Sequence, residues 1–320
     1  MNGLFNSTTY WSMLRHWGAM ARGRSYWHMP QGKGTQFVPG ALEGYFNDLT
    51  GKTSWAGAVD PLGLPLVWVN GRLQYFPVTV LQKGLGHWDL WLGSGRRDSA
   101  QWNQFERIAR WALATQDGRG GWRVPSTGAA GISAYSAMSQ GQGISLLCRA
   151  YSANQGSEHI EAAISAAKLM LTPEAAGGTT HVAPEGIVLE ETPVRQRRTI
   201  LNGWIFALYG LYDLGLVVDN DTFGVALLST VTALAALLPT FDAGFWSYYD
   251  CSGKLASPFY HRLHICQLRA LQKTFPELAS SFANTAERFE TYRRSTTDCA
   301  RAVMIKGFQK LRNPPEVVVG

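Results

Sequence analysis

The sequence predicts a mainly α-helical protein, an incomplete (α/α) toroid with a small β-element on its N-terminal side. Apolar residues recur at helical spacing through most of the chain after residue 80. Connections rich in Gly and Pro separate the helical segments, and the absence of a short repeat of fixed period does not favour a solenoid. Antiparallel helix pairs around a central axis, with loops building a cleft at one end, fit this pattern.

The change of pattern near residue 80 divides the chain into two unequal parts. In the N-terminal segment, residues 1–80, the first thirty residues show no clear period and residues 35–80 have the pattern of extended structure. Asn70-Gly71 joins the apolar runs 66–69 and 73–76, which is the strongest short-range signal for a β-hairpin. Residues 81–320 form the helical domain.

The elements of the helical domain follow from its apolar stripes. We expect helices, in chain order, around 105–113, 144–151, 160–171, 199–214, 222–238, 261–274 and 278–292. Ser99 is a plausible N-cap for the first, and Pro173 closes the third. The run 187–189 is strand-like, and Gly253 with Pro258 predicts a loop between residues 249 and 260.

Composition limits the classes of function. Hydrophobic residues make up 46% and charged residues 16% of the chain, which indicates a large core rather than disorder. A net charge of +6 favours a polyanionic partner. No zinc-finger spacing, RNP-like strand or long basic run supports nucleic acid, so we expect an acidic polysaccharide. Twelve Trp and twelve Tyr side chains favour the same partner, since aromatic faces stack on sugar rings.

Motifs for cofactors, export and membranes are missing from the sequence. The four cysteines are irregularly spaced, so free thiols are expected, with no metal and no cofactor. The first thirty residues lack a signal-peptide pattern. The longest apolar stretch, Val225 to Leu238, contains polar residues and is too short for a bilayer, so we expect a buried helix. The prediction is a soluble, cytoplasmic protein without a membrane span, with a homodimer left open.

Two groups of residues could carry proton chemistry. Glu190 and Glu191 follow the strand-like run, where a semi-buried carboxylate has a raised pKa and can act as base or acid. Tyr249 and Tyr260 lie on the expected loop, where a nearby cation (His261, Arg262 or His264) could lower a phenol pKa. The alternatives are an ordinary surface carboxylate pair and two rings that cap the core. His261 and His264 suit structural or carboxylate hydrogen bonding better than a metal.

Several motifs together resemble the C-terminal domain of the D-glucuronyl C5-epimerases, which convert glucuronate to iduronate in heparan-type chains. The most specific is YSAMSQGQGIS at 135–145. The others are FPVTVLQ at 76–82, GGWRVP at 120–125, the Glu190-Glu191 pair followed by ILNGW at 200–204, GLYDL at 210–214, LPTFDAG at 238–244 through Tyr249-Asp250, and YHRLHICQL at 260–268. The likeness spans about residues 44–275.

The resemblance implies a catalytic α/α toroid at 81–320 that needs no cofactor and binds a heparosan-like or other uronate-containing polysaccharide. Position by position, it assigns the acid/base work to Glu191, Tyr249 and Tyr260. It assigns substrate contacts to Tyr135, Gln140, Gln142, Glu190, Arg197, Arg198, Asn202, His261, Arg262 and His264. The chain departs from the family at Thr192, where the family has a tyrosine, and at 251–254, where the family has an arginine.

Removal of the C5 proton of a uronate creates an enolate-like dianion, which needs positive charge or strong donors near the carboxylate. Inversion needs an acid on the opposite face, so we expect Glu191 and Tyr260 to flank the sugar, with either taking the first proton. A polysaccharide lyase begins with the same proton abstraction and is the nearest alternative. A non-catalytic acidic-glycan-binding protein is a second. A glycoside hydrolase is less supported, because no second carboxylate pairs with Glu191.

Overall fold

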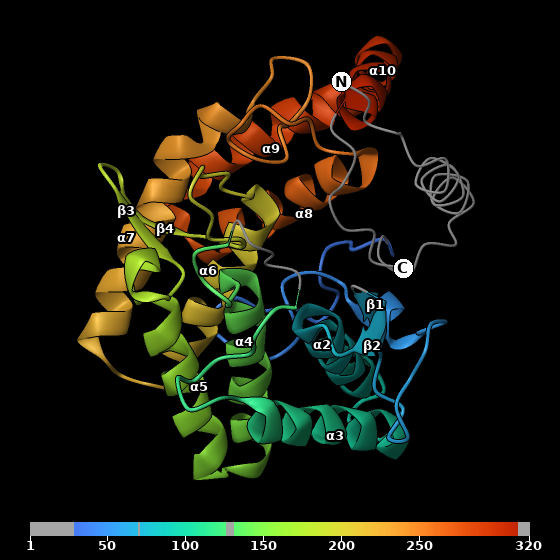
Figure 1. Cartoon of the computed structure of the whole chain (residues 1–320), viewed down its shortest axis with the longest axis vertical. Coiled ribbons are helices and arrows are strands. Elements are labelled where there is room, and N and C mark those ends of the chain that lie inside the picture. The colour runs from blue at the N-terminus through green and yellow to red at the C-terminus, as the bar shows by residue number, and fades with distance from the viewer. Residues whose placement is uncertain (1–28, 70, 126–130, 313–320) are drawn as a thin grey trace.

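The computed structural model describes residues 29–69, 71–125 and 131–312, and helices predominate among them (Figure 1), which confirms the mainly α fold class. The α-helices are α2 (Pro77–Gly93), α3 (Ser99–Thr115), α4 (Ala137–Asn154), α5 (Ser157–Met170), α6 (Leu201–Gly215), α7 (Asp221–Leu237), α8 (Pro258–Thr274), α9 (Ala279–Arg294) and α10 (Thr296–Arg312). Short 3-10 turns occupy Thr50–Thr53, Glu174–Ala176, Leu238–Phe241 and Pro276–Leu278.

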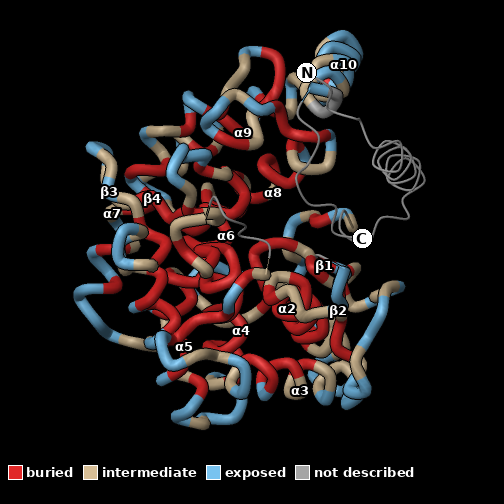
Figure 2. The backbone as a smooth tube through the Cα atoms, in the orientation of Figure 1, coloured by how far each residue is buried: buried red, intermediate tan, exposed pale blue. Residues whose placement is uncertain are grey.

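The helices pack as successive pairs. Helices α2 and α3, α4 and α5, α6 and α7, and α8 and α9 contact each other, while α2, α4, α6 and α8 contact one another in that order. Figure 1 shows the pairs following one another from α2/α3 to α8/α9. In Figure 2 the burial is densest along α4 and α6, whose residues are buried over most of their length. These two helices therefore form the centre of the core.

Helices α4 and α6 cross with their backbones in direct contact. A Cβ atom added to Gly210 would lie 2.5 Å from the Cα of Gly141, and one added to Gly141 would lie 2.5 Å from the Cα of Ala207. Such overlaps cannot be relieved by side-chain rotation, so the crossing requires glycine at both positions. The close approach therefore joins the second turn of α4 to the middle of α6.

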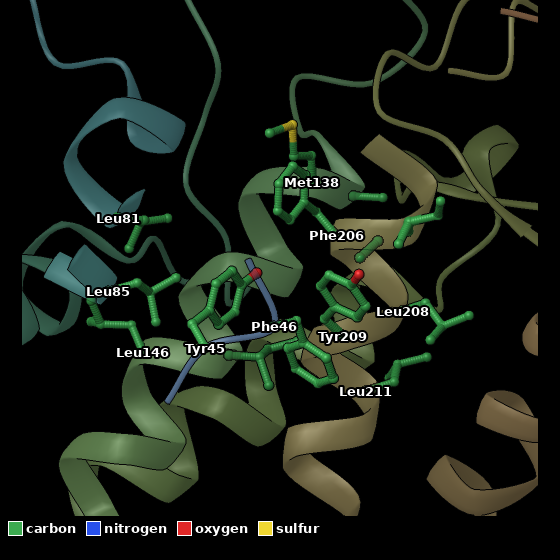
Figure 3. Close-up of a cluster of buried hydrophobic side chains, with 14 of the residues drawn as sticks. Tyr45, Phe46, Leu81, Leu85, Met138, Leu146, Phe206, Leu208, Tyr209 and Leu211 are labelled. Carbon is green, nitrogen blue, oxygen red and sulfur yellow. The ribbon is translucent and has the colours of Figure 1, made fainter. Parts of the chain in front are cut away.

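A segment without regular secondary structure, residues 43–46, enters the core between the helices (Figure 3). The ring of Phe46 stacks on Tyr209 with centroids 3.8 Å apart, and Tyr45 lies parallel to Phe206 at 6.3 Å. These four rings are almost wholly buried. Burying aromatic rings of this size is a large apolar contribution to stability, so the segment is an integral part of the core.

Buried charges hold the same segment in place, and we call this group the Arg149 network. Arg149 donates to Asp213 over 2.6 Å and to the carbonyls of residues 43 and 44. Asp89 accepts from the backbone N–H of Tyr45 at 2.9 Å. The three ionisable side chains come from α4, α6 and α2, so the network joins three helices to the segment 43–46.

Two β-hairpins accompany the helices. Strands β1 (Val67–Val69) and β2 (Arg72–Gln74) pair antiparallel, which confirms the predicted hairpin; Asn70 lies outside the described residues, and Gly71 has φ of +75°. Strands β3 (Thr180–Ala183) and β4 (Gly186–Leu189) form the second, packed on α7. Only the run 187–189 of this hairpin was expected from the sequence.

Three expected boundaries are wrong, each because a helix begins at a stronger capping signal. Helix α2 begins at Pro77, inside the stretch expected to be extended, since proline suits the first helical position. Asp98 rather than Ser99 caps α3, accepting from the N–H groups of residues 100 and 101. Helix α8 likewise begins at Pro258, so Tyr260 lies in its first turn rather than in a loop.

Helix α7 is less buried than expected. With the 3-10 turn that follows, Asp221–Phe241 is long and apolar enough to cross a membrane by length and composition, but 39% of its most apolar window is buried inside the protein. Val225 and Leu228 are more than 60% exposed on its outer face. Because its other face packs on α6 and β4, α7 is a partly exposed helix that covers the core rather than the buried helix predicted.

Candidate active site

The hairpin β3–β4 delivers two carboxylates to the start of α4 and α6. The backbone N–H of Glu190 donates to the carbonyl of Thr179, and the carbonyl of Glu190 accepts from the N–H of Ala137 at 3.0 Å. The strand end is therefore fixed to the first residue of α4. Glu191 follows at once, with its carboxylate directed at the first turn of α6.

Glu191 packs on Gly203. A Cβ atom at position 203 would overlap the Oε2 atom of Glu191, so glycine leaves the space that the carboxylate occupies. Oε2 is buried and has no hydrogen-bond partner among the described residues. Burial, reinforced by the charge of Glu190, raises the pKa of Glu191 to about 7. A carboxylate of this kind can both accept and release a proton near neutral pH.

Backbone pairing places Tyr249 beside the same turn. The N–H of Leu201 donates to the carbonyl of Tyr249 at 3.2 Å, and the N–H of Cys251 donates to the carbonyl of Thr199 at 3.0 Å. Asp250 then accepts from the N–H and the hydroxyl of Ser252, which closes the turn after Tyr249. Two segments separated by about fifty residues are thus joined where α6 begins.

Tyr249 and Tyr260 form a pair of phenols next to Glu191. Their ring centroids are 4.8 Å apart at 59°, and a side-chain hydrogen bond joins the two residues. Burial, and then the charge of Glu191, raises the pKa of both tyrosines. Both phenols therefore stay protonated at neutral pH, opposite to the lowering by a cation that the sequence suggested.

Glu190 belongs to a separate polar cluster beside the trio. Thr199 donates to its Oε1 atom at 2.6 Å, and the Nε of Arg197 lies 3.6 Å from the same atom. Burial raises the pKa of Glu190 to about 7. Arg197 also contacts His181 at 2.7 Å and Glu174 at 3.5 Å, whereas its neighbour Arg198 is exposed.

The three expected substrate contacts at the start of α4 differ in their surroundings. Tyr135 donates its hydroxyl to Asp117 at 2.6 Å. Gln140 accepts from the N–H of Trp122 and donates to two backbone carbonyls, so its amide is fully used inside the protein. Gln142 is wholly buried, and neither end of its amide has a partner among the described residues. Of the three, Gln142 alone has hydrogen-bonding capacity to spare.

Helix α8 carries the two histidines on the buried side. His261 stacks on Trp246 at 3.7 Å, and the Nδ1 of His264 lies 3.0 Å from the hydroxyl of Ser247. Burial lowers the pKa of His261 to about 4 and that of His264 to about 3, so both rings are neutral at pH 7. Asn202, buried at the start of α6, accepts at its carbonyl from the side chain of Gln267.

Arg262 lies apart from the trio. It is exposed and lines a separate cavity of about 390 Å³ together with Trp246, Phe259 and Arg293. Residues 260 and 262 point to different sides of a helix, which explains why adjacent motif positions separate in space. Among residues 29–69, 71–125 and 131–312, no group of three or more His, Cys, Asp or Glu side chains is arranged to hold a metal ion.

The sequence did not identify three contributors to this region. Ser247 joins the two histidines, and Gln267 lies on the same face of α8 as Tyr260 and His264, a spacing that could have signalled it. Helix α10 was not expected at all. Its Lys306 lies 5.9 Å from the ring centroid of Tyr249 and donates to the carbonyl of Leu255.

Comparison with known proteins matches the family described as D-glucuronyl C5-epimerase C-terminus over residues 119–291, more than half of the chain. A D-glucuronyl C5-epimerase of Caenorhabditis elegans is 29% identical over 214 residues, covering 59% of this chain and 34% of the worm protein. An uncharacterized protein of Methanocaldococcus jannaschii is 33% identical over 69 residues, 22% of each chain. The chain thus spans about a third of the length of the worm enzyme. It belongs to the family of D-glucuronyl C5-epimerase C-terminal domains.

Proposed function

We propose that this protein is a uronosyl C5-epimerase that inverts D-glucuronate to L-iduronate units in an acidic polysaccharide. The observation that carries the proposal is the half-buried group of Glu191, Tyr249 and Tyr260, a carboxylate whose pKa is about 7 beside two protonated phenols. Its scaffold is the incomplete (α/α) toroid, a reading supported by the successive helix pairs from α2/α3 to α8/α9. Heparosan is the first candidate substrate, because the worm relative is named a D-glucuronyl C5-epimerase.

In this mechanism the sugar ring lies between Glu191 and the tyrosine pair. Ionised Glu191 takes the C5 proton on one face, and Tyr260 delivers a proton to C5 from the other. Tyr249 donates a hydrogen bond to the oxygen of Tyr260, which offsets part of the cost of leaving a phenolate there. The reverse reaction uses the same groups with exchanged roles.

The enolate-like intermediate needs compensation at the sugar carboxylate. Arg197 and Arg198 stand on the exposed loop that precedes α6, on the chain that leads from Glu191 to Asn202. We assign the carboxylate to this loop, with Lys254 as a second cation on the turn that follows Tyr249. The partner is accordingly an acidic polysaccharide, with nucleic acid not expected and a homodimer as the proposed alternative to a monomer.

A polysaccharide lyase is the second candidate. It needs the leaving O4 to be protonated on the side from which the C5 proton is taken, and the two phenols are immediate neighbours. A lyase would leave an unsaturated sugar, whereas an epimerase leaves the chain intact.

Proton NMR of heparosan and of glucuronan incubated with the protein in D2O tests the proposal. We expect the C5 proton signal to be lost and iduronate-type signals to appear. Tyr260→Phe should abolish the appearance of iduronate-type signals, while Tyr75→Phe, which removes a hydroxyl bonded to Asp60, should not. Unsaturated products would establish the lyase instead, and unchanged turnover by Tyr260→Phe would refute the role of the tyrosine.

A further inference from the structure

The hydrogen bonds of His261 fix which of its ring nitrogens carries the proton. Its Nε2 lies 2.9 Å from the carbonyl oxygen of Phe289, which can only accept, so Nε2 must donate. Its Nδ1 is then a bare acceptor, because the ring is neutral. That Nδ1 accepts from the backbone N–H of Ser247 at 3.2 Å and from the Ser247 hydroxyl at 2.8 Å.

We assign the one proton of the Ser247 hydroxyl to the bare Nδ1 of His261, 2.8 Å away. With this assignment the hydroxyl oxygen accepts from the Nδ1 of His264 at 3.0 Å. Since His264 is neutral and protonated on Nδ1, its Nε2 carries a lone pair and no proton. That atom is buried and has no partner among the described residues. We call the series Phe289 carbonyl, His261, Ser247, His264 the imidazole relay.

The bare nitrogen shares a face with a catalytic tyrosine. Tyr260, His264 and Gln267 are spaced at i, i+4 and i+7 on α8, and such positions align along one side of a helix. The Nε2 of Gln267 donates to the carbonyl of Asn202 at 3.1 Å, which orients the amide and leaves its Oε1 buried without a partner among the described residues. Beside Tyr260, this face therefore presents two acceptors, one from each of the next two turns.

We propose that the Nε2 of His264 and the Oε1 of Gln267 accept hydrogen bonds from hydroxyl groups of the bound uronate, with Ser247 and His261 as positioning residues. The inference rests on the proposed function and deepens it. A buried acceptor without a partner costs free energy that a donor on the ligand recovers. A carboxylate has no proton to donate at neutral pH, so this face suits the hydroxyl edge of the sugar and not its acidic group.

The inference revises the roles expected for the two histidines. Both ring nitrogens of His261 are hydrogen-bonded inside the protein, so neither is left to bind the substrate. His264 cannot donate to the sugar carboxylate from Nε2. The bound uronate is thereby oriented with its hydroxyl edge on α8, which leaves the carboxylate to the cations of the loop at 195–198.

Nitrogen NMR on protein labelled with ¹⁵N-histidine tests the relay directly. We expect His264 as the Nδ1–H form and His261 as the Nε2–H form. Ser247→Ala should remove the selection at His264. Heparosan or glucuronan oligosaccharides should shift the Nε2 resonance of His264 in the wild-type protein. A proton on Nε2 of His264 in the free wild-type protein would overturn the inference.

Two variants at one position separate binding from mere packing. Asn places its polar atoms near the Nδ1 position, so His264→Asn keeps the contact with Ser247 and loses the acceptor. Gln reaches the Nε2 position, so His264→Gln restores an acceptor there. We expect an oligosaccharide Kd raised about 3- to 10-fold in His264→Asn, the range for one neutral hydrogen bond, and a smaller rise in His264→Gln. Equal oligosaccharide affinities in the two variants would contradict the role of the His264 Nε2 as an acceptor.

The outcomes also distinguish this inference from the proposed function. Binding by the wild-type protein without a shift at His264 overturns the acceptor face alone. Binding with the shift but without C5 exchange in D2O overturns the epimerase and leaves the acceptor face standing. No binding of any uronate oligosaccharide overturns the substrate class of both.

Discussion

The Arg149 network and the polar side chains around Glu191 differ in how completely their hydrogen bonds are satisfied. The Arg149 guanidinium donates to the carboxylate of Asp213, to the carbonyl of Ser145, and to the carbonyls of residues 43 and 44. Around Glu191, by contrast, the Oε2 of Glu191, the Nε2 of His264 and the Oε1 of Gln267 are buried without partners among the described residues. The first arrangement joins helices, and the second leaves buried acceptors unused within the described part of the protein.

The difference teaches where stability and activity reside. A satisfied network loses stability when one member is removed. A buried polar group without a hydrogen-bond partner lowers the stability of the folded protein. Its removal should therefore raise stability, at the expense of any function that the group has. Substitutions in the two regions should therefore have opposite effects.

The largest expected effect is on catalysis at the trio. Glu191→Gln and Tyr260→Phe should each lower turnover about 10²- to 10⁴-fold, the usual contribution of a general acid or base. The rate at which iduronate-type signals appear in proton NMR measures the loss. Glu158→Gln, on the exposed first turn of α5, is the matched control and should retain full activity. Near-normal exchange by Glu191→Gln would remove the carboxylate from the mechanism.

Substitutions in the Arg149 network should lower stability rather than turnover. Arg149→Ala leaves Asp213 charged and buried, which costs about 3–5 kcal/mol in unfolding free energy. Urea denaturation measures this loss. Arg96→Ala breaks an ion pair with Glu43 whose side chains are about half exposed, and it should cost under about 1 kcal/mol. Similar losses for the two variants would show that burial does not distinguish these pairs.

The pH dependence of stability sharpens the comparison. The folded pKa of Glu191 is about 7 and its unfolded value is 4.5, so the unfolded chain releases its proton first as pH rises. This residue therefore lowers stability progressively from about pH 4.5 to pH 7, by up to about 3 kcal/mol. Glu191→Gln should be more stable than wild type at pH 8 and equal to it near pH 4. Urea midpoints across this range measure the effect, and a parallel pair of curves would refute it.

Gly203 offers the smallest change. Gly203→Ala places a methyl group where the Glu191 carboxylate lies, so we expect a stability cost of about 1–3 kcal/mol and a displaced carboxylate with lower turnover. Gly215→Ala adds a methyl group in open space at the end of α6 and serves as the control. A Gly203→Ala enzyme with wild-type turnover would show that Glu191 tolerates displacement.

Much of the fold was accessible from the sequence because apolar spacing and the Asn-Gly turn are local signals. The expected loop around Tyr260 was wrong because Pro258 was treated as a break, whereas proline at the first helical position begins α8. Helix α10 was not predicted because Val303, Met304 and Phe308 lie on its exposed face. Apolar residues on both faces hide the helical period of the sequence.

For the site, family motifs led to Glu191, Tyr249 and Tyr260, and the structure gathers them in one place. The role of Ser247 could not be predicted from the sequence. Its hydroxyl contacts two imidazoles that lie 14 and 17 residues later in the chain, and these contacts form only when α8 packs against the preceding loop. The raised phenol pKa values also depend on burial, which no local pattern reveals.

Helix α10 has a bearing on how far the functional unit extends. Gln309 accepts from the N–H of Leu255 and donates to the carbonyl of Gly253, clasping the turn that follows Tyr249. The match to the family ends at residue 291, before this helix begins. A fragment ending at residue 291 would keep Tyr249 and lose the hydrogen bonds that hold the turn after it. The family match and the structural unit around Tyr249 therefore have different C-terminal ends.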